Sequence, residues 1–293
     1  MITFFPESEL IVNPDGSIFH LHLRPEQLAD KIILVGDPGR VGLVASHFNC
    51  IEHEVESREF KSITGFYKNK RITVLSTGIG CDNIDIVINE LDALANIDLQ
   101  KRTERPEHRT LEIVRIGTCG GLQPHTPIGT FILSEISVGF DGLLNFYDGR
   151  ESVCDLSFEA AFKEQVQWKN FMGNPYAVAA DHELTDRIAG VNDSTMVRGV
   201  TIACGGFYGP QGRRLRIPLA DPHLNEKIVH FNYEGHCVTN FEMESSALAG
   251  LSRLLGHKAT TVCMVIANRL AGEANTGYQT SIDDLITKVL DRI

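Results

Sequence analysis

Runs of apolar, mostly β-branched residues alternate along this chain with segments whose apolar residues recur at helical spacing. The strand-like runs cover residues 31–35, 71–75, 112–116, 131–138, 197–203 and 260–267. The helix-like segments cover residues 82–94, 155–168, 242–255 and 281–292. Continuous apolar runs are typical of strands that are buried on both faces, and their alternation with helices indicates helices packed on a sheet. The pattern therefore predicts an α/β sandwich.

We expect a single domain that spans residues 1–293. The chain has no Ser/Pro-rich linker and no internal repeat, and its 43% hydrophobic residues can supply a substantial core. The most polar stretch, residues 96–110, falls between a predicted helix and a predicted strand, so we expect a solvated loop there. Ser281 is the expected N-cap of the last helix, and the helix dipole favours Asp283 and Asp284 in its first turn.

Charge and cysteine usage bear on the function classes. The net charge of −11 opposes nucleic-acid binding, which needs a basic footprint, and residues 213–216 form the main basic cluster. No run has the length of a membrane-spanning helix, and the first residues do not have the pattern of a signal peptide. The seven cysteines include no CxxC pair, so we expect reduced thiols in the cytoplasm without a zinc site or disulfide framework.

Two glycine-rich segments that follow predicted strands are candidates for an anion site. Residues 115–121 read Arg-Ile-Gly-Thr-Cys-Gly-Gly, and residues 36–40 read Gly-Asp-Pro-Gly-Arg. Glycine lets backbone amides approach a ligand, and arginine offers a planar charged fork to a phosphate. One such segment is more often an ordinary turn with a salt-bridged arginine, but two of them could place both arginines around one anion. Cys119 is interpreted as a small turn residue rather than a nucleophile.

Two further segments contain side chains suited to a sugar and a flat heterocycle. Residues 242–245, Glu-Met-Glu-Ser, open a predicted helix, where acidic residues are stabilised by the helix dipole. Glu242 and Glu244 are two positions apart, so we expect only one to face a pocket, where it could accept bonds from two vicinal hydroxyls. Residues 207–213, Phe-Tyr-Gly-Pro-Gln-Gly-Arg, could stack on and hydrogen-bond a base, or could form an ordinary Gly/Pro loop.

In this order, the segments resemble the uridine phosphorylase branch of the nucleoside phosphorylase-I family. The matching motifs are Gly-Asp-Pro-x-Arg (36–40), Ser-Thr-Gly-Ile-Gly (76–80), Arg-Ile-Gly-Thr-x-Gly (115–120), Phe-Tyr-x-x-Gln-x-Arg (207–213) and Glu-Met-Glu-Ser (242–245). The resemblance covers nearly the whole chain and implies a three-layer α/β/α sandwich around a mixed, partly barrel-like sheet. It also implies a dimer, or a hexamer built from dimers, with active sites shared across the dimer interface.

The reaction implied by the resemblance is the reversible phosphorolysis of uridine, or of deoxyuridine, to the free base and a sugar 1-phosphate. Inorganic phosphate would be the co-substrate and the nucleophile, so no covalent enzyme intermediate and no cofactor are expected. The ribose would gain oxocarbenium character while the departing base gains negative charge that needs stabilisation. The protein would mainly align phosphate, sugar and base.

The resemblance assigns roles by motif position. The implied phosphate ligands are Gly36, Arg40, Arg58, Arg115 and Thr118, with Arg58 donated by the neighbouring subunit. The implied ribose contacts are His20, Thr118, Met243 and Glu244; His20 also comes from the neighbour and fits the motif register better than His22. The implied base contacts are Cys119, Gly120, Phe207, Gln211, Arg213 and Ile266. The expected catalytic residues are Arg115, Arg213, Glu244 and His20.

The end of the last predicted strand favours a pyrimidine substrate. Purine-cleaving relatives commonly carry an aspartate there, whereas residues 265–269 read Val-Ile-Ala-Asn-Arg, and Ile266 and Ala267 would form an apolar wall. Cys119 stands where bacterial relatives frequently have threonine, and residues 205–225 differ from compact bacterial forms in a way that could alter base specificity.

A bound metal is not expected. Glu59 and Ile79 match residues that hold a monovalent cation in some relatives, but Asn83 stands near the position of the serine ligand. Two other functions stay open at this point. One is a purine nucleoside phosphorylase or nucleosidase of the same family. The other is a non-catalytic nucleoside-binding protein, which would have no need for three phosphate-binding arginines.

Overall fold

The structure, a computed structural model, describes residues 4–191, 193–275 and 277–293. Its main strands are β1 (Lys31–Val35), β2 (Cys50–Ser57), β3 (Phe60–Tyr67), β4 (Lys70–Ser76), β7 (Glu112–Gly121), β8 (Phe131–Gly139), β10 (Met196–Ala203), β12 (His236–Glu242) and β13 (Lys258–Asn268). The short strands are β5 (Ile97–Asp98), β6 (Thr103–Glu104), β9 (Tyr176–Ala179), β11 (Asn232–Tyr233) and β14 (Glu273–Ala274). The six strands that the sequence predicts are present, within a few residues of the predicted bounds.

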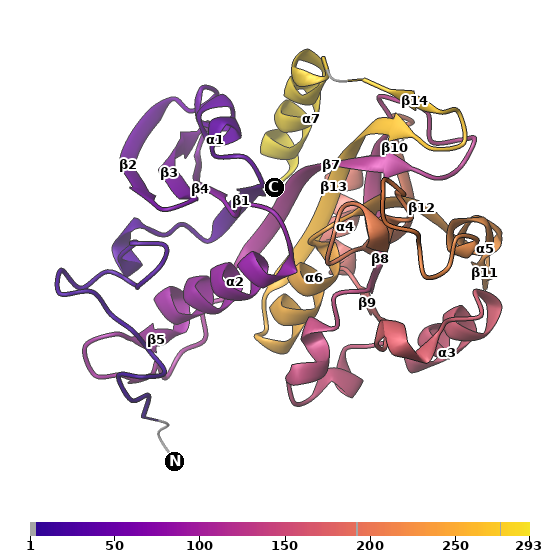
Figure 1. Cartoon of the computed structure of the whole chain (residues 1–293). Helices are drawn as coiled ribbons and strands as arrows, with labels where there is room; N and C mark the ends of the chain where they lie inside the picture. The colour runs from indigo at the N-terminus through magenta and orange to yellow at the C-terminus, as the bar shows by residue number, and fades with distance from the viewer. Residues whose placement is uncertain (1–3, 192, 276) are drawn as a thin grey trace.

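The helices connect these strands and cover the sheet (Figure 1). The α-helices are α1 (Pro38–Ala45), α2 (Cys81–Asn96), α3 (Leu156–Gln165), α4 (His182–Ala189), α5 (Leu224–His230), α6 (Ser245–Leu254) and α7 (Gln279–Arg292). Single 3-10 turns lie at η1 (Pro25–Gln27), η2 (Leu143–Phe146), η3 (Arg150–Ser152), η4 (Asn170–Met172) and η5 (Gly209–Gln211).

The large sheet is mixed and partly closed. Its strand order is β11-β12-β10-β8-β13-β7-β1-β4-β3-β2. β12 also pairs with β7, through Asn240 opposite Gly121 and Phe241 opposite Gly120. This second pairing closes β7, β12, β10, β8 and β13 into a ring, while β1, β4, β3 and β2 extend from the ring as an open sheet. The predicted mixed, partly barrel-like sheet is therefore confirmed.

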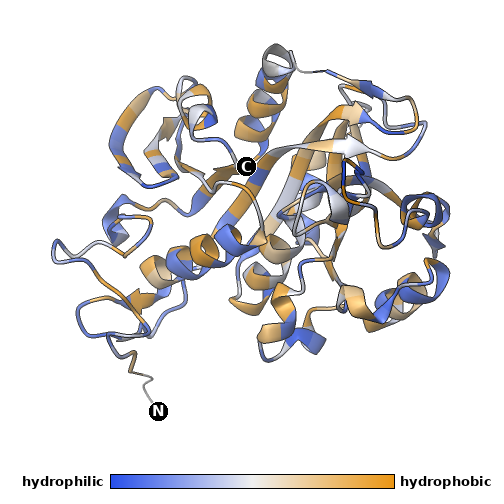
Figure 2. Cartoon of the chain, in the orientation of Figure 1, coloured by the Kyte–Doolittle hydropathy of each residue, from blue (hydrophilic) through white to orange (hydrophobic). Residues whose placement is uncertain are grey.

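Alternation along β1 shows how the sheet divides the core into layers. Ile32 and Leu34 pack into a cluster with residues of α2 and α6. Ile33 and Val35 pack into another cluster with residues of α1, α4 and α7. Successive side chains of a strand point to opposite faces, so helices cover both faces of this part of the sheet and make the expected α/β/α sandwich. Figure 2 shows the hydrophobic residues gathered along the central strands and the inner sides of the helices.

Three local predictions are wrong. Residues 117–121 do not form a turn, because β7 continues to Gly121 and pairs with β13 and β12 along the way. Glu242 ends β12 rather than opening a helix, and α6 begins at Ser245. Ser281 lies inside α7, which begins at Gln279 after Tyr278 at the N-cap position.

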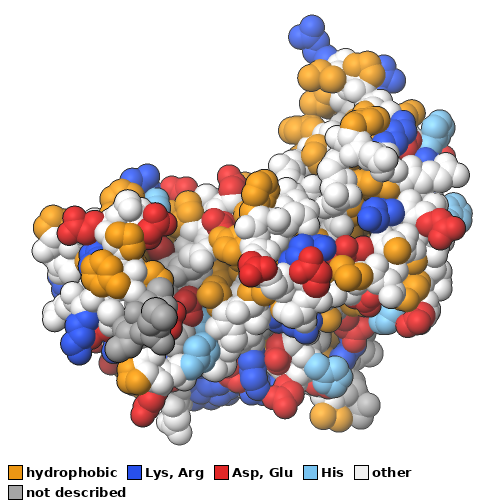
Figure 3. Space-filling view, turned by 90° about the horizontal axis from the view of Figure 1, so that it is seen from below, with side chains coloured by type: hydrophobic (Ala, Val, Ile, Leu, Met, Phe, Trp, Pro, Cys, Tyr) orange, Lys and Arg blue, Asp and Glu red, His pale blue; other side chains and the backbone are white. Residues whose placement is uncertain are grey.

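The surface agrees with a chain of negative net charge. On the face seen in Figure 3, Lys and Arg side chains are interspersed with Asp and Glu and form no continuous basic stripe. Within the described ranges, none of the helices is both long enough and apolar enough to cross a membrane.

Candidate active site

The parallel pairing of β1 with β4 and β7 brings three chain segments to one edge of the sheet. Val35 lies opposite Ser76 on one side and Ile116 on the other, so the residues after each strand meet there. A cavity of about 1020 Å³ opens at this edge. Its lining includes these residues named from the sequence: Gly36, Arg40, Arg115, Thr118, Cys119, Gly120, Phe207, Gln211, Arg213, Met243, Glu244 and Ile266. Arg40 and Arg115, which lie far apart in the sequence, thus share one cavity.

Arg115 is buried between two carboxylates. Its Nη1 lies 3.3 Å from Glu242 Oε2, and its Nη2 donates to Glu244 Oε2. Burial by itself would lower the pKa of Arg115, but Glu244, Cys263 and Glu242 outweigh that effect and hold the pKa above its ordinary value. The prediction that only one of the two glutamates faces the pocket is wrong. Helical spacing does not apply to them, because Glu242 ends a strand and Glu244 precedes the first helical residue.

Glu242 also caps the N-terminus of α6. Its carboxylate accepts hydrogen bonds from the backbone N–H of Glu244 (2.9 Å) and of Ser245 (3.0 Å), and from Ser245 Oγ (2.6 Å). The two backbone N–H groups are among those that a helix leaves without intrahelical partners at its start. Burial raises the pKa of Glu242 to about 7, although the nearby Arg115 opposes the rise.

Glu244 and Met243 are fixed against the first turn of α2. The Gly80 N–H donates to Glu244 Oε1 at 2.8 Å, and the Cys81 thiol donates to the Met243 carbonyl at 3.1 Å. Both oxygens of Glu244 therefore have one protein donor each. A carboxylate oxygen can accept a second hydrogen bond, so both oxygens still have capacity for hydroxyl groups.

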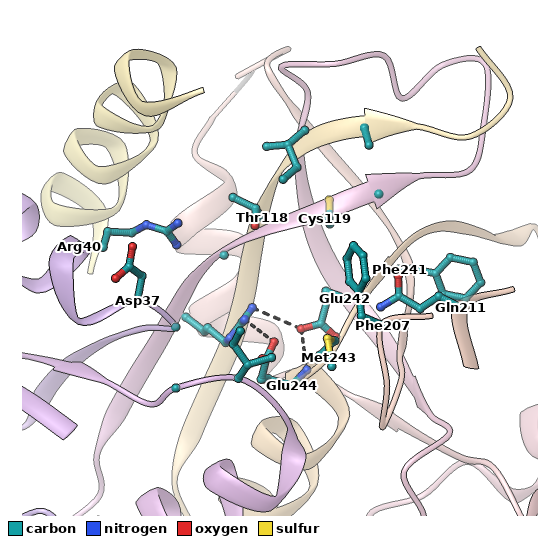
Figure 4. A pocket seen from close by; sticks show the side chains of 18 of the residues that line it. Asp37, Arg40, Thr118, Cys119, Phe207, Gln211, Phe241, Glu242, Met243 and Glu244 are labelled. Atoms are coloured by element: carbon teal, nitrogen blue, oxygen red, sulfur yellow. Dashed lines mark hydrogen bonds and ion pairs between the residues drawn. The ribbon is translucent and has the colours of Figure 1, made fainter. Parts of the chain in front are cut away.

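The Arg40 end of the cavity is formed by the start of α1. Asp37 caps this helix by accepting from the Gly39 N–H at 2.8 Å. Arg40 Nη1 donates to the Ile116 carbonyl at 3.4 Å, and Figure 4 shows the guanidinium extending from α1 toward β7 and Thr118. The arrangement places a positive side chain beside the backbone of β7, as a phosphate site would require.

The opposite end of the cavity contains the aromatic and amide side chains. Arg213 Nη1 donates to the Phe207 carbonyl (2.8 Å) and to Gln211 Oε1, and the Arg213 guanidinium lies 3.7 Å from the Phe207 ring centroid. Burial, aided by nearby Arg269, lowers the pKa of Arg213 to about 10. Phe241 of β12 also lines this end. It was missed because residues 236–242 were not predicted as a strand.

The end of β13 contributes no acid to the cavity. Ile266 lies at an irregularity of the β13–β7 pairing, between Val265 and Ala267, and lines the cavity together with Ala267. Asn268 turns away into structural bonds, because its Nδ2 donates to the Thr126 carbonyl at 2.9 Å and its Oδ1 accepts from the Leu270 N–H at 3.0 Å.

Cys119 is a buried thiol in the wall of the cavity. Burial raises its pKa well above the ordinary value, and the neighbouring Cys263 adds to the rise. A thiol nucleophile needs the opposite shift, toward the thiolate. This supports the interpretation that Cys119 is not a nucleophile, although the residue lies within β7 and not in the expected turn. The three positions considered for a cation, Glu59, Ile79 and Asn83, line the same cavity.

His20 and Arg58 are not among the residues that line this cavity. They lie near each other, because the Arg58 guanidinium is 5.5 Å from the Phe19 ring centroid and the Phe19 ring packs on that of His20. Arg58 occupies the turn between β2 and β3 with a φ of 56°. Both residues were predicted to act in a neighbouring subunit, and a position outside their own cavity is compatible with that role.

Comparison with known proteins identifies the family. Residues 30–292 match the family described as the phosphorylase superfamily, so the chain belongs to it. Its relatives include uridine phosphorylases. This chain is 30% identical to the uridine phosphorylase of Haemophilus influenzae, over 88% of this chain and 89% of the relative. It is 28% identical to the uridine phosphorylase of Thermococcus kodakarensis, over 93% of this chain and 85% of the relative.

Other relatives show the breadth of the family. A DeoD-type purine nucleoside phosphorylase of Oceanobacillus iheyensis is 28% identical to this chain, covering 94% of this chain and 98% of the relative. The solved structure of a Trypanosoma brucei nucleoside phosphorylase, described as showing uridine phosphorylase activity, superposes with a TM-score of 0.88. It is 29% identical and covers 97% of this chain and 99% of that chain. The family and fold expected from the motifs are therefore confirmed.

Proposed function

We propose that this protein catalyses the reversible phosphorolysis of uridine to uracil and ribose 1-phosphate. The observation that carries the proposal is the order of side chains along one cavity. Arg40 lies at one end, Met243 and Glu244 lie in the middle with Arg115 paired to Glu244, and Gln211 with its partner Arg213 lies at the other end (Figure 4). This order matches the three parts of the reaction: an anionic nucleophile, a sugar with vicinal hydroxyls, and a base that departs with negative charge.

The chemistry follows from these positions. Arg40, Arg115 and the backbone near Gly36 and Thr118 would hold phosphate next to the anomeric carbon. Glu244 would accept bonds from the ribose hydroxyls, and its negative charge would favour the positive oxocarbenium character that the sugar develops. Arg213 would offset the charge that grows on the uracil carbonyl oxygens. Phosphate is the only co-substrate in this scheme, and no cofactor takes part.

The preference for a pyrimidine rests on the end of β13. A purine leaving group benefits from an acid that protonates its ring nitrogen, but Ile266 and Ala267 line the cavity there and Asn268 is committed to backbone bonds. The Gln211 amide has a donor and an acceptor, which suits the uracil edge. Because the named relatives include a purine enzyme, inosine is the substrate whose turnover tests this preference.

We also propose that the working unit is a dimer in which His20 and Arg58 of each subunit complete the cavity of the other. Their position outside their own cavity motivates this proposal. Arg58 would add a further positive charge at the phosphate, and His20 would contact the 5′-hydroxyl of the ribose.

Activity measurements test the function directly. Uracil release should require phosphate, and turnover should fall in the order uridine, then thymidine, with inosine and methylthioadenosine poor substrates. Release at the same rate without phosphate would indicate a nucleosidase. Faster turnover of inosine would indicate a purine enzyme, and uridine binding without turnover under any of these conditions would indicate a binding protein.

A further inference from the structure

Glu90, in the third turn of α2, holds the segment that carries His20. Its carboxylate accepts hydrogen bonds from the backbone N–H of His20 (3.0 Å) and of Leu21 (2.9 Å). Glu90 Oε1 also lies 2.6 Å from His20 Nδ1. The Glu90 side chain is 13% exposed and that of His20 is 28% exposed, so the contact is sheltered while part of the His20 side chain remains exposed.

These contacts define how the imidazole is presented. A carboxylate beside Nδ1 favours the proton on that nitrogen, which leaves the lone pair of the neutral ring on Nε2. In the described part of the chain, no protein group forms a hydrogen bond with His20 Nε2, so this nitrogen is available to an external donor. Three bonds to one carboxylate fix both the backbone and the ring.

His22, two residues later, is arranged differently. Its Nε2 lies 3.4 Å from Asp15 Oδ2 and its Nδ1 lies 3.3 Å from Asn13 Nδ2, so both ring nitrogens have neighbours within the same loop. Its side chain is 45% exposed, and its φ is 56°. His22 is therefore a suitable control for a histidine in the same segment without the Glu90 contact.

We propose that Glu90 is a positioning residue that makes His20 select nucleosides with a free 5′-hydroxyl. Glu90 keeps the proton on Nδ1, and His20 Nε2 then accepts a hydrogen bond from the 5′-hydroxyl in the neighbouring subunit's cavity. The inference rests on the proposed function, in which His20 contacts the ribose. Glu90 itself touches no substrate.

The helix that carries Glu90 also supports a ribose contact in its own subunit. Gly80, at the N-cap of α2, donates to Glu244, and Glu90 follows ten residues later, about 15 Å along the helix axis. One rigid element thus supports Glu244 for one cavity and His20 for the other. A single helix can hold both side chains more accurately than two independent loops could.

The test compares uridine with 5′-deoxyuridine, which lacks only the 5′-hydroxyl. In Glu90→Gln, the amide NH₂ would face Nδ1, so the proton should move to Nε2. The ring could then only donate to the 5′-hydroxyl oxygen, and the hydroxyl hydrogen would lose its acceptor. We expect kcat/KM for uridine to fall about tenfold and that for 5′-deoxyuridine to change less than about twofold. His20→Ala should give the same pattern, and the double variant should lose no more than His20→Ala alone. His22→Asn should leave both substrates unchanged.

The contrary results are equally specific. An equal loss on both substrates in Glu90→Gln, or additive losses in the double variant, would mean that Glu90 only supports the fold and would overturn the inference while uridine phosphorolysis stands. A readout without turnover is the ¹H–¹⁵N spectrum of His20, assigned by its absence in His20→Ala. It should show protonated Nδ1 in the wild type and protonated Nε2 in Glu90→Gln. An unchanged spectrum overturns the inference even if the wild type fails to cleave uridine.

Discussion

Arg115 has two roles in the cavity, and they can be separated experimentally. It is paired with buried Glu242 and Glu244, so Arg115→Ala leaves two buried carboxylates without their cation. We expect the free energy of unfolding to fall by about 3–5 kcal/mol, together with loss of phosphorolysis. Arg40→Ala is the matched control, because Arg40 makes one long bond to a carbonyl. It should raise KM for phosphate and change the free energy of unfolding by less than about 1 kcal/mol, as chemical denaturation would show.

Glu242 gives a prediction for pH. Its pKa is about 7 in the folded protein, compared with an ordinary value of 4.5. Between these values the folded state holds one proton more than the unfolded state, so stability should fall as pH rises from about 5 to 8. Ionisation of Glu242 should lower the free energy of unfolding by about 3 kcal/mol over this range. Denaturation curves of the wild type and Glu242→Gln, measured at both ends of this range, should differ in pH dependence by that amount. Parallel pH profiles would show that Glu242 is ionised throughout.

At the scale of residues, the sequence predicted which side chains line one cavity, but not which of them form hydrogen bonds and ion pairs with one another. Residue types with distinctive chemistry, such as Arg40 and Gln211, could be identified from their motifs and do line the cavity. The contact of Arg115 with both glutamates depends on the junction between a strand and a helix, which periodicity does not resolve. The role of Glu90 could not be predicted from the sequence, since an acidic residue on a helix is usually solvated.

At the scale of elements, the backbone of β7 at Gly117 lies against the side chain of Arg115, which is two residues earlier on the same strand. A Cβ added at Gly117 would lie 2.3 Å from Arg115 Nη1 and 2.7 Å from Cys263 Sγ, which is closer than atoms can pack. Gly117→Ala should therefore displace the guanidinium, reduce the free energy of unfolding by about 1–3 kcal/mol and lower turnover. Gly120→Ala, on the same strand, meets its nearest atom at 3.8 Å and should leave stability within about 0.5 kcal/mol. Equal effects of the two variants on denaturation would contradict this account.

The same strand shows why element bounds were only partly predictable. Long β-branched runs such as residues 112–116 identified strands correctly, because burial on both faces gives a continuous apolar signal. The following glycines suggested a turn, yet pairing with two neighbouring strands keeps residues 117–121 extended. Hydrogen bonds to the neighbouring strands thus outweigh the local preference of these glycines for a turn.

At the scale of the whole molecule, ring closure was expected only through the family resemblance. The β12–β7 pairing joins residues more than a hundred positions apart, and it brings Phe241 and Glu242 beside the strand that carries Arg115. Apolar periodicity reports which residues are buried but not which strands are neighbours. The order of motifs along the chain therefore carried more information on the site than any single segment.

Sharing of cavities between subunits can be tested by complementation. Arg40→Ala removes a residue of a subunit's own cavity, whereas Arg58→Ala removes the residue proposed to serve the partner. In a mixed dimer of these variants, one cavity lacks both arginines and the other is intact, so coexpression should restore about a quarter of wild-type activity. Arg40→Ala mixed with Gln211→Ala is the control, because both residues line the same cavity and every site in the mixed dimer keeps one defect. If the first mixture gave only the mean activity of its two parent variants, Arg58 would not act across an interface.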